Sequence, residues 1–351
     1  YDEADGSLLL SRDRFGEKPL YLYRDGTGLY FGSEVKFIAA LLGRRLPVNV
    51  NHLYRYLVNG YKALYKGRET FFQGLEELPA ASVLLLDGQG QEEQRRYWVP
   101  VSVQDEAMTY DEAVNEARQA LLRSVELRLR ADVPLAFCMS GGIDSNALIS
   151  IAKNVFGYDV HGFTIVNQDQ RYDEWAFVQH AVETQGLRHT AIPLSTADFL
   201  PQLRTLVRQH DAPVYTISYY VHWLLMKSVA AHGYRIAISG TGADELFSGY
   251  YDHHNLYLAA VADDPARFEA ALAGWQQHIA PLVRNPFLQN PRVFIDNPAL
   301  RDHIYLNAAD FAAYLYDGWA EPFAEAEYTD NLLRNRMLNE LFHEAVPVIL
   351  H

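Results

Sequence analysis

The chain has 351 residues, of which 49% are hydrophobic and 21% charged, and its formal net charge is −14. This composition supplies ample core for a globular protein, and the length favours two domains. The negative charge argues against nucleic-acid binding, and because no apolar run reaches 18 residues we expect no membrane span. The single cysteine, Cys138, excludes an internal disulfide and fits a reducing, cytoplasmic location.

The first hundred residues are predicted to be rich in β-structure, because short apolar runs alternate with glycine-containing turns. Asp25-Gly26 and Gly28 mark one hairpin, and Gly88-Gln-Gly90 marks a second. The predicted elements are strands at 7–12, 19–24, 29–33, 82–87 and 92–97 and an amphipathic helix at 51–58.

This segment resembles the later half of the α+β, Ntn-type glutaminase domain of class-II amidotransferases of the asparagine synthetase type. The similar stretches are Ser11 to Tyr21, Phe31 to Lys36 and Phe71 to Pro79. The family places its catalytic cysteine at the mature N-terminus and most glutamine-binding residues in the first half of the domain. Neither is in this sequence, and Cys138 lies in the wrong domain to replace the nucleophile. We therefore expect an internal fragment that does not itself hydrolyse glutamine.

A linker is predicted at 100–107, which divides the chain into domains at 1–104 and 105–351. Thr109 and Glu112 have the spacing of a capping box, so a helix should begin here. Its apolar residues recur at helical spacing at Val114, Ala117, Leu121, Val125 and Leu129.

Residues 133–139 form an apolar run typical of a buried parallel strand, and Ser140-Gly-Gly-Ile-Asp-Ser145 follows it directly. A strand, a glycine turn and a helix N-terminus together create a phosphate site, because backbone amides and the helix dipole favour an anion. The hydroxyls of Ser140 and Ser145 can add donors. Asp144 repels phosphate unless a divalent cation lies between them, so we expect it to bind Mg²⁺.

This loop resembles the pyrophosphate loop of N-type ATP pyrophosphatases, which cleave ATP between the α- and β-phosphates and adenylate an oxygen of their substrate. Neither the Walker spacing nor the dinucleotide fingerprint is present at this position. The resemblance implies an adenine-nucleotide α-hydrolase-like fold and the use of ATP.

Strands and helices alternate after this loop, which predicts a doubly wound parallel sheet with its ligand at the carboxyl ends of the strands. The predicted strands are 161–166, 189–194 and 235–238, and the predicted helices are 173–185, 196–209 and 219–232. A second glycine turn, Ser239 to Glu245, leaves the last strand. Its Asp244 is the expected partner of Asp144 in holding Mg²⁺.

The second turn resembles the Ser-Gly-x-Gly-x-Asp-Glu motif of asparagine synthetases, and Leu246 to Tyr250 continues the match. By position, the resemblance implies nucleotide contacts for Met139, Ile165, Ser239 and Gly240 in addition to the first loop. The family usually has glutamate where this chain has Thr241, and threonine cannot act as a base at neutral pH.

From Asp263 onward the chain is predicted to be helical, with Leu333, Met337, Leu338 and Leu341 in the core. His253 and His254 are expected at the surface, since adjacent histidines seldom share a metal on regular structure. The family usually carries an essential lysine for pyrophosphate, which we expect beyond residue 351.

The sequence therefore predicts ATP-dependent amide synthesis by an asparagine-synthetase-like ligase. Aspartate would be adenylated and then amidated by ammonia derived from glutamine, with ATP and Mg²⁺ as cofactors. The residues that we assign to catalysis are Asp144, Ser145 and Thr241. The metal ligands are expected to be Asp144 and Asp244. The residues expected to bind the nucleotide are Met139, Ser140, Gly141, Gly142, Asp144, Ser145, Ile165, Ser239 and Gly240. Two alternatives stay open: another carboxylate, such as a sugar acid or natural product, and a non-catalytic nucleotide-binding relative. The expected partners are small molecules, and a homodimer is left open.

Overall fold

The computed structural model describes residues 1–105, 107–167, 169, 173–304 and 308–350. The chain divides into two compact units, one made of Tyr1–Ser102 with Gly242–His351 and the other of Val103–Thr241. The first junction falls within the predicted linker. Because two segments far apart in the sequence pack together in the first unit, this spatial division differs from a division along the chain, and the boundary at 104 stays a prediction.

The N-terminal segment forms two three-stranded antiparallel sheets. Their orders are β1-β5-β6 and β3-β2-β4, with bounds β1 (Leu8–Ser11), β2 (Tyr21–Asp25), β3 (Gly28–Gly32), β4 (Leu75–Glu77), β5 (Ser82–Leu86) and β6 (Glu92–Arg96). Both predicted hairpins are confirmed. Leu10 and Leu84 of one sheet and Leu22 of the other belong to one buried cluster, so the two sheets share a core.

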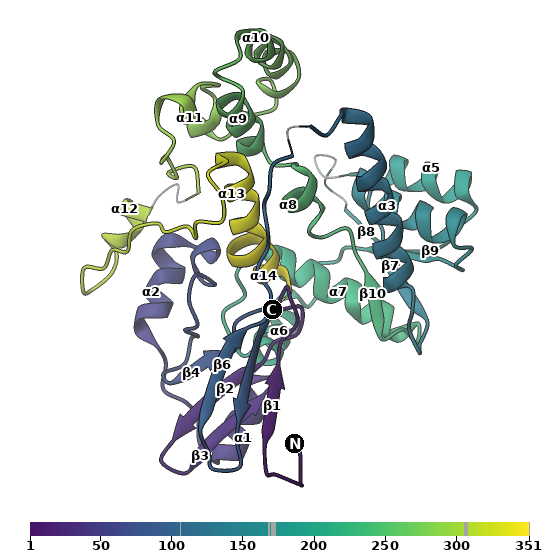
Figure 1. Cartoon of the computed structure of the whole chain (residues 1–351). Helices are drawn as coiled ribbons and strands as arrows, with labels where there is room; N and C mark the ends of the chain where they lie inside the picture. Colours follow the sequence, from purple (N-terminus) through teal and green to yellow (C-terminus); the bar gives the residue numbers. More distant parts are fainter. Residues whose placement is uncertain (106, 168, 170–172, 305–307, 351) are drawn as a thin grey trace. The chain divides into compact units, whose positions relative to one another are not determined.

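The helices of this unit come from both ends of the chain. They are α1 (Val35–Leu42), α2 (Val50–Asn59), α8 (Ala243–Phe247), α9 (Tyr251–Ala260), α10 (Pro265–Gly274), α11 (Val293–Asp296), α12 (Ala308–Ala312), α13 (Leu332–Asn339) and α14 (Ala345–Leu350), with the short turns η1 (Tyr61–Ala63), η4 (Trp275–Ile279), η5 (Pro286–Leu288) and η6 (Glu340–Glu344). Leu338 and Leu341 are buried, as predicted, and pack in one cluster with Phe15 and Trp98. The last helices (yellow in Figure 1) thus share a core with the N-terminal segment.

The second unit contains a four-stranded sheet of order β10-β7-β8-β9 in which every neighbouring pair is parallel (Figure 1). The strands are β7 (Leu135–Cys138), β8 (His161–Val166), β9 (Arg188–Pro193) and β10 (Ile236–Ile238), and the helices are α3 (Tyr110–Arg128), α4 (Ile143–Ser150), η2 (Ile151–Val155), α5 (Trp175–Gln185), α6 (Phe199–His210) and α7 (Ile217–Ala231). The chain runs from β7 outward to β9 and then returns to the other side of β7 as β10. The topological switch point therefore lies between β7 and β10.

Helices cover both faces of this sheet, which confirms the predicted doubly wound α/β fold. Leu135 and Phe137 of β7 pack in a cluster with residues of α3, α4 and α5. The intervening Ala136 packs in a different cluster, with Leu225 and Val229 of α7. Alternate residues of one strand thus face opposite layers, as period-2 geometry requires.

The capping box predicted at the start of this unit is confirmed. The Thr109 hydroxyl accepts the Glu112 amide and the Glu112 side chain accepts the Thr109 amide, so the capping box is complete. Cys138 lies at the end of β7, where burial raises the pKa of its thiol to about 11. The thiol is therefore protonated at neutral pH and is a weak nucleophile.

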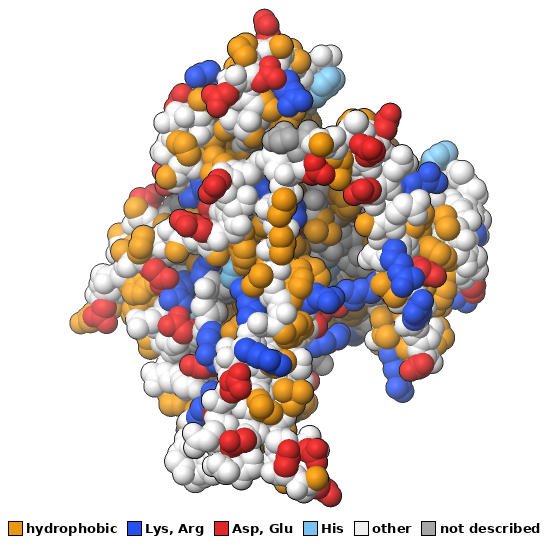
Figure 2. Space-filling model, in the orientation of Figure 1, with side chains coloured by type: hydrophobic (Ala, Val, Ile, Leu, Met, Phe, Trp, Pro, Cys, Tyr) orange, Lys and Arg blue, Asp and Glu red, His pale blue; other side chains and the backbone are white. Residues whose placement is uncertain are grey.

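Acidic side chains are scattered over the visible face of the molecule and do not gather at one place (Figure 2). Among the described residues, we find no helix that combines the length and the apolar character needed to cross a membrane.

Candidate functional site

The phosphate-loop motif lies where the sequence predicts it, between β7 and α4. The Met139 amide donates to the Phe163 carbonyl of β8, and the Met139 carbonyl accepts from the Thr164 hydroxyl at 2.8 Å. Gly142 is the residue before α4, and Asp144 lies in the first turn of that helix. The Met139 side chain is buried in the core, so only its backbone faces the loop, and both backbone groups already have protein partners.

The loop is ordered by its own hydroxyls. The oxygens of Ser140 and Ser145 lie 3.0 Å apart, and the Ser140 amide donates to the Ser145 hydroxyl. The Gly142 amide donates to the Ser140 hydroxyl at 3.1 Å. The Asn146 side chain donates to the carbonyls of Ser140 and Gly142. Ser145 is buried and serves the loop itself, and its assignment as a phosphate donor stays a prediction.

One amide of the loop is held by a residue that the sequence did not predict. The Gly141 amide donates to a carboxylate oxygen of Glu174, just before α5, at 2.8 Å. A Cβ at Gly141 would lie 2.9 Å from the Glu174 Cβ and 3.1 Å from the Phe177 Cβ, so only glycine fits without a shift. Glu174 precedes the helix after β8, the next strand of the sheet. Glu174 therefore lies at the same sheet edge as the loop, and its position after β8 was the feature of the sequence that could have identified it.

The β10 turn lies directly against the first loop. A Cβ at Gly240 would be 3.0 Å from the Asp144 Cβ and 3.0 Å from the Ser145 amide nitrogen. The hydroxyls of Ser239 and Thr241 are 2.6 Å apart on the exposed side of this turn. The structure thus brings together Ser140 to Ser145 and Ser239 to Thr241, as expected from the pairing of β7 with β10.

Ile165 lies one residue before the end of β8 and is partly buried against the α7 side of the sheet. Its contact with the nucleotide stays a prediction.

Asp244 belongs to the other unit, where it lies in the first turn of α8. The turn after α8 wraps its carboxylate: Ser248 has φ 70°, and a Cβ at Gly249 would lie 1.6 Å from the Asp244 Oδ1. The neighbouring Glu245 is 1% exposed and accepts the Tyr250 hydroxyl at 2.6 Å. Burial raises the pKa of Glu245. The joint binding of Mg²⁺ by Asp144 and Asp244 stays a prediction.

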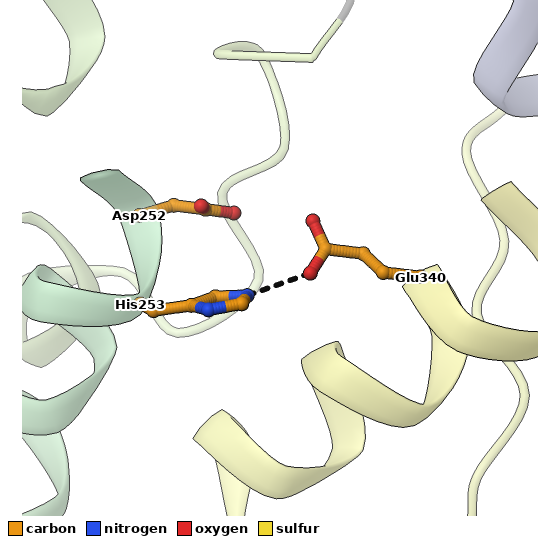
Figure 3. A group of neighbouring side chains, drawn as sticks. All are labelled: Asp252, His253 and Glu340. Carbon is orange, nitrogen blue, oxygen red and sulfur yellow. Dashed lines mark hydrogen bonds and ion pairs between the residues drawn. The ribbon is translucent and has the colours of Figure 1, made fainter. Parts of the chain in front are cut away.

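A buried polar group joins α9 to the α13–η6 segment in the same unit. Asp252, His253 and Glu340 point toward one another there (Figure 3). The prediction of a surface position is wrong for His253, which is 0% exposed. Its side of α9 packs on α13, and this long-range contact has no local signature.

Cations balance the carboxylates of this cluster. Arg336 is buried and pairs with Asp252, Glu340 and Glu344. Burial alone would raise the pKa of Glu344, but Arg336 and Lys66 hold it at about 2. Burial would likewise raise the pKa of Asp252, but a hydrogen bond from His303 and the charge of Arg336 hold it well below its usual range.

Two family sequence models match the chain. One, described as a glutamine amidotransferase domain, matches residues 1–98. The other, described as asparagine synthase, matches residues 116–325, more than half of the chain. The chain belongs to the asparagine synthase family.

Curated relatives in the family include synthetases and an amidase. A putative glutamine-hydrolysing asparagine synthetase of Methanocaldococcus jannaschii is 26% identical over 73% of this chain and 50% of its own length. Asparagine synthetase 1 of Bacillus subtilis is 25% identical over 81% of this chain and 43% of its length. Amidase chyE of Penicillium rubens is 26% identical over 69% of this chain and 38% of its length. The chain spans about half, or less, of the length of these relatives.

Proposed function

We propose that the intact protein is an ATP-dependent ligase that converts a carboxylate into an amide with ammonia derived from glutamine. The observation that carries this proposal is the ordered loop of Ser140 to Ser145 at the switch point, closed from the β10 side by Gly240. The family match to a synthase segment and to a glutamine amidotransferase segment supports both halves of the reaction.

In the first step a carboxylate oxygen attacks the α-phosphorus of ATP. An oxygen–phosphorus bond forms, the bond between the α-phosphorus and the bridging oxygen breaks, and pyrophosphate leaves with the electron pair. Ammonia nitrogen then attacks the acyl carbon, AMP leaves, and a proton is lost from nitrogen. Loop amides and the N-terminus of α4 would stabilise the negative charge that develops on pyrophosphate.

Magnesium fits the donor set of the two turns. Asp144 and Asp244 offer hard carboxylate oxygens, each from the first turn of a helix beside a glycine turn. When bound, the ion would neutralise charge on the leaving pyrophosphate. The role assigned to the protein is to hold these side chains in place, which is favoured by the close approach of Gly240 to the Asp144 Cβ and of Gly249 to the Asp244 carboxylate.

Aspartate is the acceptor that we propose first, because the relatives with synthetase names are asparagine synthetases. Thr241 favours a second candidate, another carboxylate. Its hydroxyl is paired with Ser239, so it offers no base near the reacting groups. The chain is also similar to a relative that is named an amidase and not an asparagine synthetase, which is compatible with such an acceptor.

The test of the metal-dependent step is Asp144→Asn in the intact protein, with carboxylate-dependent release of pyrophosphate from ATP as the readout. We expect a loss of at least about 100-fold, since the carboxylate is replaced by a neutral amide. Asp159→Asn, at an exposed site of the same unit, is the matched control and should keep the wild-type rate. An Asp144→Asn protein with the wild-type rate would refute the assignment.

The acceptor is tested by comparing aspartate with a uronic acid in the same assay, with amide formation measured by mass spectrometry. Asparagine formed stoichiometrically with AMP would establish aspartate. Amidation of the uronic acid alone would establish the second candidate, and nucleotide binding with no turnover of either would favour a non-catalytic role.

A further inference from the structure

The carboxylate of Asp244 is held in position by the turn that follows its helix. The 1.6 Å distance from the Asp244 Oδ1 to a Cβ built on Gly249 means that the carboxylate rests directly on the glycine backbone. Ser248, just before it, has the left-handed φ of 70° that directs the chain back over α8. Where the turn lies therefore decides where the Asp244 oxygens can point.

The turn at Ser248 and Gly249 is itself held by the buried imidazole of His253. The Gly249 amide donates to the Nδ1 of His253 at 3.2 Å. Because Nδ1 accepts an amide hydrogen, it carries no proton, and the neutral ring must carry its proton on Nε2. Nε2 lies 2.6 Å from the Oε2 of Glu340, to which it donates. The tautomer of His253 is thus fixed from both sides.

Glu340 is fixed as well. It is 0% exposed, and its second oxygen accepts from Arg336 at 3.0 Å and from Lys62 at 3.4 Å. A run of contacts therefore leads from Glu340 through His253 and the Gly249 amide to Asp244, and every member belongs to one compact unit.

A metal ion is the other explanation for this group, because ligand atoms of Asp252, His253 and Glu340 all lie within 4.8 Å of one another (Figure 3). The hydrogen bonds disfavour it. A metal on Nε2 would require the proton on Nδ1, where it would face the Gly249 amide hydrogen. Arg336 already forms ion pairs with both carboxylates.

We propose that His253 and Glu340 are positioning residues that set the Mg²⁺-binding geometry of Asp244 through the Gly249 turn. This inference rests on the proposed function, in which Asp244 is a metal ligand. Groups that orient a ligand from behind typically change metal affinity by about 10–100-fold when they are replaced.

The test uses two substitutions of His253 that each keep one half of its function. In His253→Asn the amide oxygen can replace Nδ1 and accept from Gly249, whereas in His253→Gln the amide nitrogen can replace Nε2 and donate to Glu340. The readout is the Mg²⁺ concentration for half-maximal pyrophosphate release by the intact protein. We expect it to rise about tenfold or more in His253→Gln and about threefold or less in His253→Asn.

His303→Gln is the matched control, because His303 is buried in the same network but contacts Asp252 and not the turn. It should lower the thermal midpoint without changing the Mg²⁺ requirement. Equal Mg²⁺ requirements in His253→Gln and His303→Gln would overturn the proposal. Gly249→Ala, at an exposed position where folding should survive, adds a methyl group at the Asp244 carboxylate and should raise the requirement at least as much. An unchanged requirement in that variant also overturns it.

Asp244→Asn distinguishes a failure of the proposed metal role of Asp244 from a failure of the positioning role of His253 and Glu340. If it leaves the Mg²⁺ requirement unchanged, the metal role in the proposed function fails. If it raises the requirement but His253→Gln and Gly249→Ala do not, only the positioning role fails. Elemental analysis of the dialysed protein tests the metal explanation: a tightly bound transition metal that is lost in Glu340→Gln would overturn our assignment.

Discussion

Glu174 holds an amide that a phosphate would need. Its carboxylate accepts from Gly141 at 2.8 Å, so an anion in the loop must displace it or tolerate its charge. Glu174→Gln keeps an acceptor oxygen and removes the charge. We expect the dissociation constant for pyrophosphate, measured by calorimetry, to fall about 3–10-fold, which is about 1 kcal/mol of relieved repulsion.

Glu174→Ala is the companion variant, because it removes both the charge and the acceptor. It should bind pyrophosphate at least as well as the wild type if repulsion is the main effect. Weaker binding by both variants would show instead that Glu174 serves to order the loop.

His52 should make stability depend on pH. It is buried, and its ring meets Phe71 edge-on with centroids 4.7 Å apart. Burial, helped by the charge of Arg55, lowers its pKa from 6.5 to about 4. Between these values the unfolded chain takes up a proton that the folded protein does not, so the free energy of unfolding falls as pH falls from about 6.5 to 4, by up to about 3 kcal/mol.

In His52→Gln this contribution is absent, and Gln can still accept from Arg55. We expect the difference in unfolding free energy between pH 7 and pH 4.5, from urea titrations, to be smaller than in the wild type by about 2–3 kcal/mol. Parallel pH curves for the two proteins would contradict the lowered pKa.

At the scale of elements, α3 depends on its first turn. Thr109 and Glu112 exchange backbone and side-chain hydrogen bonds there, and both side chains are exposed. Thr109→Ala should lower the free energy of unfolding of the second unit by about 1 kcal/mol, since one helix amide loses its partner. Urea unfolding followed by circular dichroism measures this, and Thr109→Ser should restore most of it.

Elements whose signals are local could be predicted from the sequence. The capping box, the glycine turns after β7 and β10, and the alternation of strands and helices each depend on neighbours within a few positions. The prediction of a helical chain from Asp263 onward is wrong for residues 313–331, between α12 and α13, which have no regular structure. The helices before them are short, because the shape of this stretch follows from packing on other segments.

At the scale of the whole molecule, ion pairs join the two segments of the first unit. Lys66 pairs with Glu344, Lys62 with Glu340, and Arg55 with Glu321. Lys66→Gln removes one charge beside Glu344, which keeps Arg336, so we expect a loss of about 1–3 kcal/mol in unfolding free energy.

Hydrogen–deuterium exchange identifies the segments that Lys66→Gln destabilises. In Lys66→Gln, amide exchange should accelerate both in η1 and in η6–α14, whereas β7 and β8 should exchange as in the wild type. Acceleration in the N-terminal segment alone would contradict a shared core.

Contacts between residues far apart in the chain are what the sequence could not predict. Glu340 lies 87 positions from His253, and no periodicity relates two residues so far apart. The family resemblance assigned roles to residues of the two glycine turns, but it gave no role to Glu174 or to the buried network, where long-range packing decides which side chains meet.

The Lys62–Glu340 and Lys66–Glu344 pairs also set a delay during synthesis. Each joins residues 278 positions apart. At ribosomal rates of about 5–20 residues per second, each glutamate is synthesised on the order of tens of seconds after the lysine with which it pairs. Phe15 and Trp98 likewise gain their contact with Phe342 only after it has been synthesised. The N-terminal segment therefore exposes aromatic surface until η6 has been synthesised, and exposed apolar surface of this kind favours aggregation of a nascent chain.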